Sequence, residues 1–398
     1  MKKSFALVTA FIISLISAFA LLSGCAFDAE YGYRSKTYYG VMNSLAELTV
    51  YDTFTVNGVA DNEKADKFIM VADETETLLR GLDSSLSTAY ENSDISRFNA
   101  AEGGTEVEIG EDAYNVLSVA MEIYRLTDGY YNPAVYYSVR AYGFNGGTEP
   151  KDFFDLPSDD VLSGYTQLSS KFSELVLSNR DGKYYALKPE SVTVGGEELP
   201  MRLDLGGVGK GYAADKVEQL LEDNGYKYFK FNFASSSVSF GRFPSEEETF
   251  RLGLSNPRKE EEGAPITYMS LDVCDASVSS SADDVNFYTL TDANGEERRF
   301  CHIFNPFTGR PIDSGIMSAT VIGGKAAEND ALTTAIMAMG VDKAISFIDE
   351  KLTEGPFERR VAFSFSDDSG YKFYTNIPEG EYIADSENFT PIKNSALR

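Results

Sequence analysis

Basic residues are scarce in this 398-residue sequence, in which 35 Lys and Arg stand against 62 Asp and Glu for a formal net charge of −27. This charge repels nucleic acid phosphates, so no nucleic acid partner is expected. A phosphate-bearing ligand would need a divalent cation or backbone donors to offset it. Tryptophan is absent, but 27 Phe and 24 Tyr allow a sizeable core. With 43% hydrophobic and 24% charged residues, 33 Gly and 13 Pro, the composition is that of an ordinary globular protein, which excludes collagen, coiled coil and disorder for the whole chain. The sequence shows no internal repeat and no low-complexity run.

Cysteine is also rare, with three residues in all. Beyond the N-terminal segment only Cys274 and Cys301 remain, too few for a disulfide framework in a chain of this length. We expect each to be a small buried apolar side chain. Their spacing leaves open whether they pair.

The third cysteine, Cys25, ends a segment typical of a bacterial lipoprotein signal. Two lysines precede an uncharged, mostly apolar run over residues 5–22, and small residues stand directly before Cys25. We expect removal of residues 1–24, lipidation of Cys25, a tether over 25–40, and a location on the outer face of the cytoplasmic membrane. The alternative is an uncleaved membrane anchor, because the run approaches the roughly 20 residues that span a bilayer.

Hydrophobic patterning predicts an α+β fold in a domain over residues 41–390, with largely antiparallel sheets flanked by helices. Strands often follow strands directly, which disfavours a doubly wound parallel sheet. Helices are expected at 61–87, 111–126, 155–168, 207–224, 326–339 and 341–352, and strands at 45–57, 173–178, 184–188, 201–205, 227–240, 249–254, 266–273, 298–304 and 318–323. Residues 129–150 are too rich in Gly, Asn, Pro and Tyr for a regular element, and such a loop is uncommon unless it binds something.

A glycine-rich turn at residues 203–215 (LDLGGVGKGYAAD) leads from a predicted strand into a helix. Backbone without Cβ can approach a ligand closely, and the first turn of a helix presents unpaired N–H groups to an anion. The spacing fits neither a Walker loop nor a Rossmann fingerprint. The alternative is a turn whose glycines serve packing alone.

Residues 326–335 begin another helix, with Asp330 and Thr334 four residues apart and Thr333 beside them. A carboxylate and a hydroxyl on one helix face are oxygen ligands of the kind that Mg²⁺ prefers. The alternative is an acid that interacts with the helix dipole while the threonine packs.

The only histidine, His302, begins the segment HIFNPFTGRP (302–311). Its imidazole could transfer a proton or contact a ligand near neutral pH. The alternative is a hairpin turn with a structural histidine.

Together these segments resemble the FAD:protein FMN transferases, the ApbE family, over nearly all of the chain after the signal. The similar stretches are VMNS (41–44, where the family has Met-Gly-Thr), LDSSLSTAYENSDISRFN (82–99), GYYNPAV (129–135), DLGGVGKGYAAD (204–215), HIFNPFTGRP (302–311) and AENDALTTAIMAMG (327–340). The resemblance implies an ApbE-like, T-fold-like architecture. It departs at residues 232–237 (NFASSS), where the family usually has Asn-x-Gly-Gly-[DN], at Asn43-Ser44 and at Asn305, which leaves weakened FAD binding open.

The resemblance also implies roles for single residues. Met42, Tyr90, Tyr131, Asn132 and Pro133 would line the flavin; Asp204 and Lys210 would contact FAD; the Gly207 carbonyl with Asp330, Thr333 and Thr334 would hold Mg²⁺; and His302 would lie at the reacting phosphates. His302 and Asp330 would then be the catalytic residues.

The implied activity is Mg²⁺-dependent transfer of the FMN moiety of FAD to a Thr or Ser hydroxyl of an extracytoplasmic electron-transfer protein, with release of AMP. Two alternatives remain at this point: FAD hydrolysis to FMN and AMP, and a non-catalytic FAD-binding lipoprotein.

Overall fold

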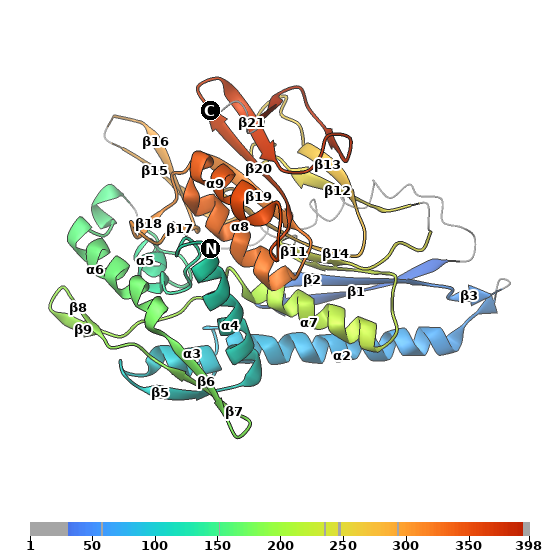
Figure 1. Cartoon of the computed structure of the whole chain (residues 1–398), viewed down its shortest axis with the longest axis horizontal. Coiled ribbons are helices and arrows are strands. Elements are labelled where there is room, and N and C mark those ends of the chain that lie inside the picture. The colour runs from blue at the N-terminus through green and yellow to red at the C-terminus, as the bar shows by residue number, and fades with distance from the viewer. Residues whose placement is uncertain are drawn as a thin grey trace, which may run out of the picture.

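The computed structural model describes residues 31–56, 59–150, 152–234, 236–245, 248–292 and 294–392. The predicted signal segment and the predicted lipidation site Cys25 lie outside these residues. No helix within the described ranges is long and apolar enough to cross a membrane. Helices and mostly antiparallel sheets build one mixed structure (Figure 1), so the predicted α+β fold is confirmed.

A nine-stranded sheet forms the centre of the fold, in the order β1-β2-β10-β11-β14-β19-β20-β21-β23. Its strands are β1 (Gly32–Val41), β2 (Ser44–Asp52), β10 (Phe229–Phe233), β11 (Ser237–Phe240), β14 (Ala276–Ala282), β19 (Ile316–Ile322), β20 (Arg360–Asp367), β21 (Gly370–Thr375) and β23 (Phe389–Ile392). Neighbouring strands are antiparallel except β21 and β23, which are parallel. Every residue of β19 is buried, because both faces of the sheet are covered there.

Residues 32–41, most of which we expected in the tether, form the edge strand β1. It pairs with β2 along its length, and the hydroxyl of the buried Tyr38 donates to the carbonyl of Ala72 at 3.0 Å. The tether prediction is therefore wrong for this stretch. Met42 and Asn43 form the turn between β1 and β2, with φ of 47° and 54°. Positive φ at both positions suits the right-handed twist of a two-residue hairpin.

Three helices, α2 (Asn62–Leu86), α7 (Gly209–Asp223) and α8 (Ala326–Met339), cover one face of the sheet (Figure 1). The side chain of Asp61 caps α2 by accepting a hydrogen bond from the N–H of Lys64 at 3.1 Å. Because α8 packs between α7, α4 (Glu111–Leu126) and strands β14 and β19, it is buried almost all round.

The opposite face of the sheet is covered by a three-stranded sheet of β12 (Phe250–Ser255), β13 (Thr267–Val273) and β22 (Tyr382–Ala384). Tyr268 and Leu271 of β13 are fully buried there in a second apolar core, together with Phe373 and Phe389 of the large sheet. The fold therefore has three layers, and the helical layer carries the segments of interest.

Smaller elements complete the chain. The helical ones are α3 (Asp94–Ala100), α5 (Tyr136–Ala141), η1 (Phe153–Asp155), α6 (Asp159–Ser170), η2 (Lys171–Glu174), α9 (Val341–Phe347) and the π-helical turn η3 (Ile348–Leu352). The remaining strands are β3 (Thr55–Val56) with β4 (Val59–Ala60), β5 (Glu106–Ile109) with β6 (Val176–Arg180) and β7 (Lys183–Leu187), β8 (Val192–Val194) with β9 (Glu197–Leu199), β15 (Phe287–Thr291) with β16 (Glu297–Cys301), and β17 (Phe304–Asn305) with β18 (Arg310–Pro311).

The long helices match their predicted ranges, and α4 and α8 do so at both ends. The predicted strand at 227–240 is instead the hairpin of β10 and β11, which turns at Ala234. Strand β14 was not predicted, because its serine-rich sequence ASVSSSA lacks apolar alternation.

The two described cysteines do not pair. Cys301 is buried as expected, and burial raises the pKa of its thiol to about 11. The expectation of burial is wrong for Cys274, which is exposed where the chain reverses between β13 and β14.

Candidate active site

The segment before the glycine turn is extended but is not a strand, so the strand predicted at 201–205 is wrong. The side-chain amide of Asn99 makes the two backbone hydrogen bonds that a neighbouring strand would make in a sheet. Its Nδ2 donates to the Leu203 carbonyl at 2.9 Å, and its Oδ1 accepts from the Leu203 N–H at 2.7 Å. The next N–H, that of Asp204, donates to the Pro133 carbonyl at 2.8 Å. This bond joins the glycine turn to the loop predicted to line the flavin.

Two glycines of the turn stand where α7 approaches α8. A Cβ at Gly211 would lie 2.2 Å from the Ala326 carbonyl oxygen, closer than real contacts allow. At Gly207 a Cβ would lie 3.0 Å from Thr334 Oγ1 and 3.5 Å from the Tyr131 ring. Packing therefore explains Gly211, whereas Gly207 lies where the predicted metal ligands and the flavin loop meet.

Asp330 is the carboxylate at this meeting point. It is 3% exposed, and its Oδ2 accepts from the Gly211 N–H at 3.1 Å. Burial raises the pKa of Asp330, while Lys210 and the Gly211 hydrogen bond oppose the rise. It is the fifth residue of α8, two residues beyond the first-turn acid Glu328, and its carboxylate bonds to the backbone of α7 rather than to the start of its own helix, so the helix-dipole alternative does not account for it. A buried carboxylate of raised pKa gains from a nearby cation.

The two adjacent threonines of α8 point to different partners. Thr334 Oγ1 donates to the Asp330 carbonyl at 3.2 Å and lies against Gly207. Thr333 Oγ1 donates to the same carbonyl at 2.8 Å and lies 2.9 Å from the hydroxyl of Ser281 in β14. Only Thr334 therefore faces the glycine turn.

Tyr131 brings a buried hydroxyl with no hydrogen-bond partner to the same place. The residue is 2% exposed, and burial, then the charges of Asp330 and Asp204, raise the pKa of its hydroxyl well above the usual range. It therefore remains a proton donor without an acceptor. A buried polar atom left without a partner calls for an explanation, and a ligand oxygen or an ordered water supplies one.

Asn132 shapes the flavin loop from within. Its Nδ2 donates to the Ser169 carbonyl at 2.9 Å, and its Oδ1 accepts from the Ala134 N–H at 2.9 Å. Both ends of the amide are thus used by the fold, and Asn132 fixes the backbone that presents Tyr131.

His302 lies beside the short loop that precedes β15. Its N–H donates to the Asn286 carbonyl at 3.0 Å, and its Nδ1 lies 3.2 Å from the same oxygen. An acceptor at that position makes Nδ1 the protonated nitrogen and leaves Nε2 free to accept a proton. Burial and then Lys210 lower the pKa of His302, against the opposing effects of Asn286 and Asp204. The imidazole is therefore neutral near pH 7.

Lys210 and Asp204 connect these groups electrostatically. The Lys210 Nζ donates to the Gly206 carbonyl at 3.2 Å, and its charge acts on both Asp330 and His302. Asp204 accepts from the N–H of Gly206 at 2.9 Å and from the amide of Asn145. A cation from α7 thus acts on both the buried carboxylate and the imidazole.

Met42 and Tyr90 come from other parts of the fold. Met42 lies in the β1–β2 turn, partly buried against the main core. Tyr90 is 48% exposed, and its hydroxyl lies 3.3 Å from Asp83. In the part of the chain described, no hydrogen bond or ion pair joins either side chain to Asp330 or His302.

Three turns from distant parts of the chain nevertheless lie at one end of the large sheet. The Ala234 N–H donates to Leu45 at the start of β2, and the Ser280 N–H donates to Ser236. Ser281 then reaches Thr333 on α8. The β1–β2 turn, the β10–β11 turn and the turn of α8 that carries Thr333 therefore lie at one end of the large sheet.

The donor set suits Mg²⁺ better than a soft metal. No group of three or more His, Cys, Asp or Glu residues that could hold a metal is found within the described ranges. Asp330, the Thr334 hydroxyl and backbone carbonyls are all oxygen donors, and Mg²⁺ commonly keeps waters and substrate phosphates for its other positions. With the unpartnered Tyr131 hydroxyl beside it, the site fits an ion and a phosphate together.

A match between the amino-acid sequence and a family profile decides which family the chain belongs to. The profile described as "ApbE family" matches residues 42–355. The chain belongs to the ApbE family. It is 27% identical over 273 residues to the FAD:protein FMN transferase of Escherichia coli K12, covering 68% of this chain and 72% of that one. It is 26% identical over 345 residues to the Klebsiella pneumoniae protein of the same name, covering 86% and 91%.

Solved structures of ApbE proteins show the same fold. The flavin transferase ApbE from Vibrio cholerae superposes with a TM-score of 0.66 at 20% identity, over 87% of this chain and 97% of that chain. The apo form of the Pseudomonas stutzeri flavinyl transferase ApbE gives 0.67 at 21% identity, over 88% and 96%. The predicted family and the ApbE-like architecture are therefore confirmed.

The segment in which this ApbE chain departs from the family pattern contains an unusual backbone conformation. Ala234, at the first Gly of the family's Asn-x-Gly-Gly pattern, has φ of 56°. Its N–H donates to the Leu45 carbonyl at 2.9 Å, so the turn is built without the glycine. Alanine carries a steric cost in this region that glycine does not.

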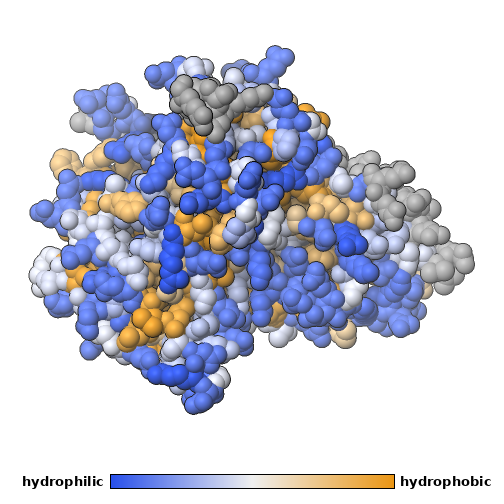
Figure 2. All heavy atoms as spheres, viewed as in Figure 1, coloured by the Kyte–Doolittle hydropathy of each residue, from blue (hydrophilic) through white to orange (hydrophobic). Residues whose placement is uncertain are grey.

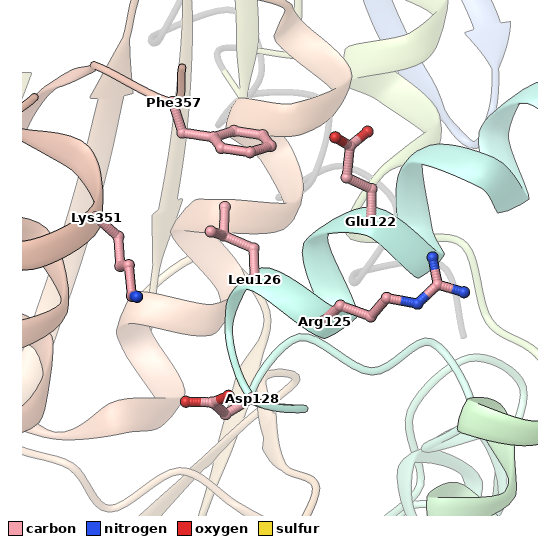
Figure 3. A pocket seen from close by; sticks show the side chains of 6 residues that line it. All are labelled: Glu122, Arg125, Leu126, Asp128, Lys351 and Phe357. Carbon is pink, nitrogen blue, oxygen red and sulfur yellow. The ribbon is translucent and has the colours of Figure 1, made fainter. Parts of the chain in front are cut away.

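A separate pocket of about 400 Å³ lies between the end of α4 and the π-helical turn η3 (Figure 3). Leu126 and Phe357 form its apolar part, and charged side chains surround them. None of its lining residues belongs to the predicted site. The surrounding surface is mostly hydrophilic, with scattered apolar patches (Figure 2).

Several residues of the site were not predicted from the sequence. They are Asn99, Asn145, Asp215, Ser281 and Asn286, each of which contacts the glycine-turn segment, a predicted residue or the helix of one. Asn99 and Asp215 lay inside similar stretches, but no role was predicted for either.

Proposed function

We propose that this chain is a Mg²⁺-dependent FAD:protein FMN transferase, which moves the FMN moiety of FAD to a Thr or Ser hydroxyl of an acceptor protein and releases AMP. The main support is that Thr334 and the Tyr131 ring meet at Gly207, while the buried Asp330, one helical turn before Thr334, is bonded to Gly211 at the start of α7. The hydroxyl of Tyr131 has no hydrogen-bond partner there. The ApbE family membership and relatives named FAD:protein FMN transferase support the same reaction.

In this proposal Asp330, the Thr334 hydroxyl and the Gly207 carbonyl hold the metal ion. When bound, the ion neutralises the diphosphate oxygens and acts as a Lewis acid. Thr333 stays outside the ligand set, because its hydroxyl lies against Ser281 of β14, whereas that of Thr334 lies against Gly207.

The other side chains orient the substrate and move the proton. Lys210 offsets phosphate charge in a protein whose net charge is strongly negative. The acceptor hydroxyl gives its proton to Nε2 of His302, whose Nδ1 is held by Asn286. The new bond joins the acceptor oxygen to the FMN phosphorus, and the bond from that phosphorus to the bridging oxygen breaks, so that AMP leaves with that oxygen.

The metal assignment is tested by two adjacent substitutions on one helix, Thr334→Val and Thr333→Val. We expect Thr334→Val to raise the Mg²⁺ concentration needed for half-maximal AMP release by about tenfold or more, as for a lost ligand. Thr333→Val should leave this concentration nearly unchanged, because it removes a contact to Ser281. A larger increase in this concentration for Thr333→Val than for Thr334→Val would contradict the assignment. Full AMP release by Asp330→Ala in the presence of Mg²⁺ would contradict the metal site itself.

Transfer and hydrolysis are separated by the fate of the flavin. AMP released together with unbound FMN, and no gain of mass by the acceptor, would make the chain an FAD hydrolase. FAD binding without AMP release would make it a flavin-binding protein.

We also propose that Cys25 is lipidated and holds the enzyme on the outer face of the cytoplasmic membrane, where its acceptors would be extracytoplasmic electron-transfer proteins. The support is the apolar run followed by LSGC at residues 22–25. Metabolic labelling with a palmitate analogue tests this: the wild type should be labelled and Cys25→Ala should not. Labelling of both would contradict it.

A further inference from the structure

Asp215 caps a helix to which it does not belong. It lies on α7, and its Oδ1 and Oδ2 accept hydrogen bonds from the N–H groups of Ala326 and Ala327 at 2.7 and 2.9 Å. These N–H groups open α8 and have no partner within that helix. The residue at the N-cap position of α8 is Lys325, whose side chain makes no capping bond. The cap is therefore supplied across 111 residues of sequence.

The same two helices are also joined in the opposite direction. Asp330 of α8 accepts from the N–H of Gly211 in the first turn of α7. Gly211 in turn lies against the Ala326 carbonyl, so closely that a Cβ would stand 2.2 Å from it. Each helix thus gives a carboxylate to the backbone of the other, and both carboxylates lie four residues beyond the point of contact.

This arrangement fixes where α8 lies along α7. A shift of α8 along its axis would break the bonds of Asp215 and the bond of Asp330 together. It would also move Asp330 and Thr334 relative to Gly207 and Lys210, which belong to the start of α7 and the turn before it. A misplacement of about 1 Å can cost on the order of a hundredfold in rate.

We propose that Asp215 is a positioning residue, which sets the register of α8 against α7 and so places the Asp330 carboxylate at the metal site. The proposal rests on the proposed function for its effect on catalysis. A local cap would serve helix stability equally well, since Ser or Asp at position 325 would supply one. A partly buried carboxylate on α7 is a costlier solution, because desolvation raises the pKa of Asp215 to about 7. What Asp215 provides beyond a local cap is a link between α7 and α8.

The first test compares two partly buried carboxyl groups of the same helix. Asp215→Asn keeps one acceptor oxygen but turns an NH₂ group toward the other N–H. Glu218→Gln is the matched control, because Glu218 also lies on α7 and contacts Ser277 of β14 at 3.3 Å rather than α8. We expect Asp215→Asn to raise the Mg²⁺ concentration for half-maximal FAD binding by about tenfold or more. Glu218→Gln should change it by less than about twofold. Equal effects of the two would overturn the proposal.

The second test separates positioning from helix stability. Adding Lys325→Ser to Asp215→Asn gives α8 a local cap without a link to α7. We expect this double variant to recover much of the melting temperature lost by Asp215→Asn while its Mg²⁺ requirement stays raised. Recovery of both would show that Asp215 acts through helix stability alone and would overturn the proposal.

Hydrogen exchange at the Gly211 amide gives a readout that needs no substrate. If the link sets the register, Asp215→Asn should speed exchange at Gly211, because the bond to Asp330 loosens with it. Unchanged exchange would overturn the proposal. If the wild type binds no FAD with Mg²⁺, the proposed function fails, and the exchange result still decides the role of Asp215.

Discussion

Asn99 holds the backbone of Leu203 with both ends of its amide, donating to the carbonyl at 2.9 Å and accepting from the N–H at 2.7 Å. The pair joins α3 to the segment that enters the glycine turn. Because Asp204 follows directly and is bonded to Pro133, this contact sets where the turn begins relative to the flavin loop.

Asn99→Ala should be strongly destabilising. It leaves a buried N–H and a buried carbonyl without partners, at roughly 1–3 kcal/mol each, so we expect a loss of about 2–6 kcal/mol in the free energy of unfolding. Denaturant unfolding measures it. The control is Asn224→Ala, which removes one bond to the Leu220 carbonyl at the partly exposed end of α7 and should cost less than about 1 kcal/mol. A loss as small as the control's would contradict the role given to Asn99.

Tyr131→Phe should separate stability from ligand binding. Without ligand, the variant should be as stable as the wild type or more so, because it removes a buried hydroxyl that has no partner. With Mg²⁺, we expect its affinity for FAD to fall about tenfold, as for one lost hydrogen bond to a charged oxygen. Thermal melting and FAD titration measure the two effects.

The control for Tyr131 is Tyr226→Phe. Tyr226 also has a buried hydroxyl without a hydrogen-bond partner, but it follows the far end of α7, about 20 Å along the helix. The Tyr226→Phe substitution should leave the affinity for FAD unchanged. Unaltered FAD affinity in Tyr131→Phe would show that its hydroxyl does not meet the substrate.

Ala234→Gly should stabilise the protein, because Ala234 has φ of 56°. Relief of this conformation is worth about 1 kcal/mol. Thermal unfolding measures it, with Ala276→Gly in β14 as the matched change, which should destabilise by roughly 0.5–1 kcal/mol. A lower melting temperature for Ala234→Gly would mean that the turn tolerates alanine without strain.

The pH dependence of transfer should report the His302 imidazole. Burial lowers the pKa of His302 below 6.5, so its neutral form prevails near pH 7. We expect kcat/KM to be level around pH 7 to 8 and to fall below about pH 6 as a single proton blocks Nε2. His302→Gln should lose most activity and this acid limb. An acid limb centred above pH 7 would contradict a neutral imidazole as the proton acceptor.

Local patterns predicted the parts of the fold that are locally determined. The helical periodicity of α4 and α8 gave both ends of each, and the spacing of Asp330 and Thr334 placed them on one helix face. The glycine turn was located correctly, and the structure adds that Gly211 serves the approach of two helices.

Contacts between distant segments could not be predicted in this way. Asn99 meets Leu203 across 104 residues, and Asp215 meets Ala326 across 111. No periodicity marks such pairs, because each residue type is common and its partner is backbone. Strand β14 was missed because hydroxyl contacts bury its serines, among them the pair of Ser279 with Ser237 at 3.2 Å.

The central claim is tested most directly by the mass of an acceptor domain with a target Thr or Ser, incubated with residues 26–398 of this chain, FAD and Mg²⁺. The account predicts a gain equal to one FMN bound as a phosphoester, one AMP released per acceptor, and loss of both with EDTA or in Asp330→Ala. An unchanged acceptor mass, at Mg²⁺ and FAD concentrations that saturate binding, would contradict it.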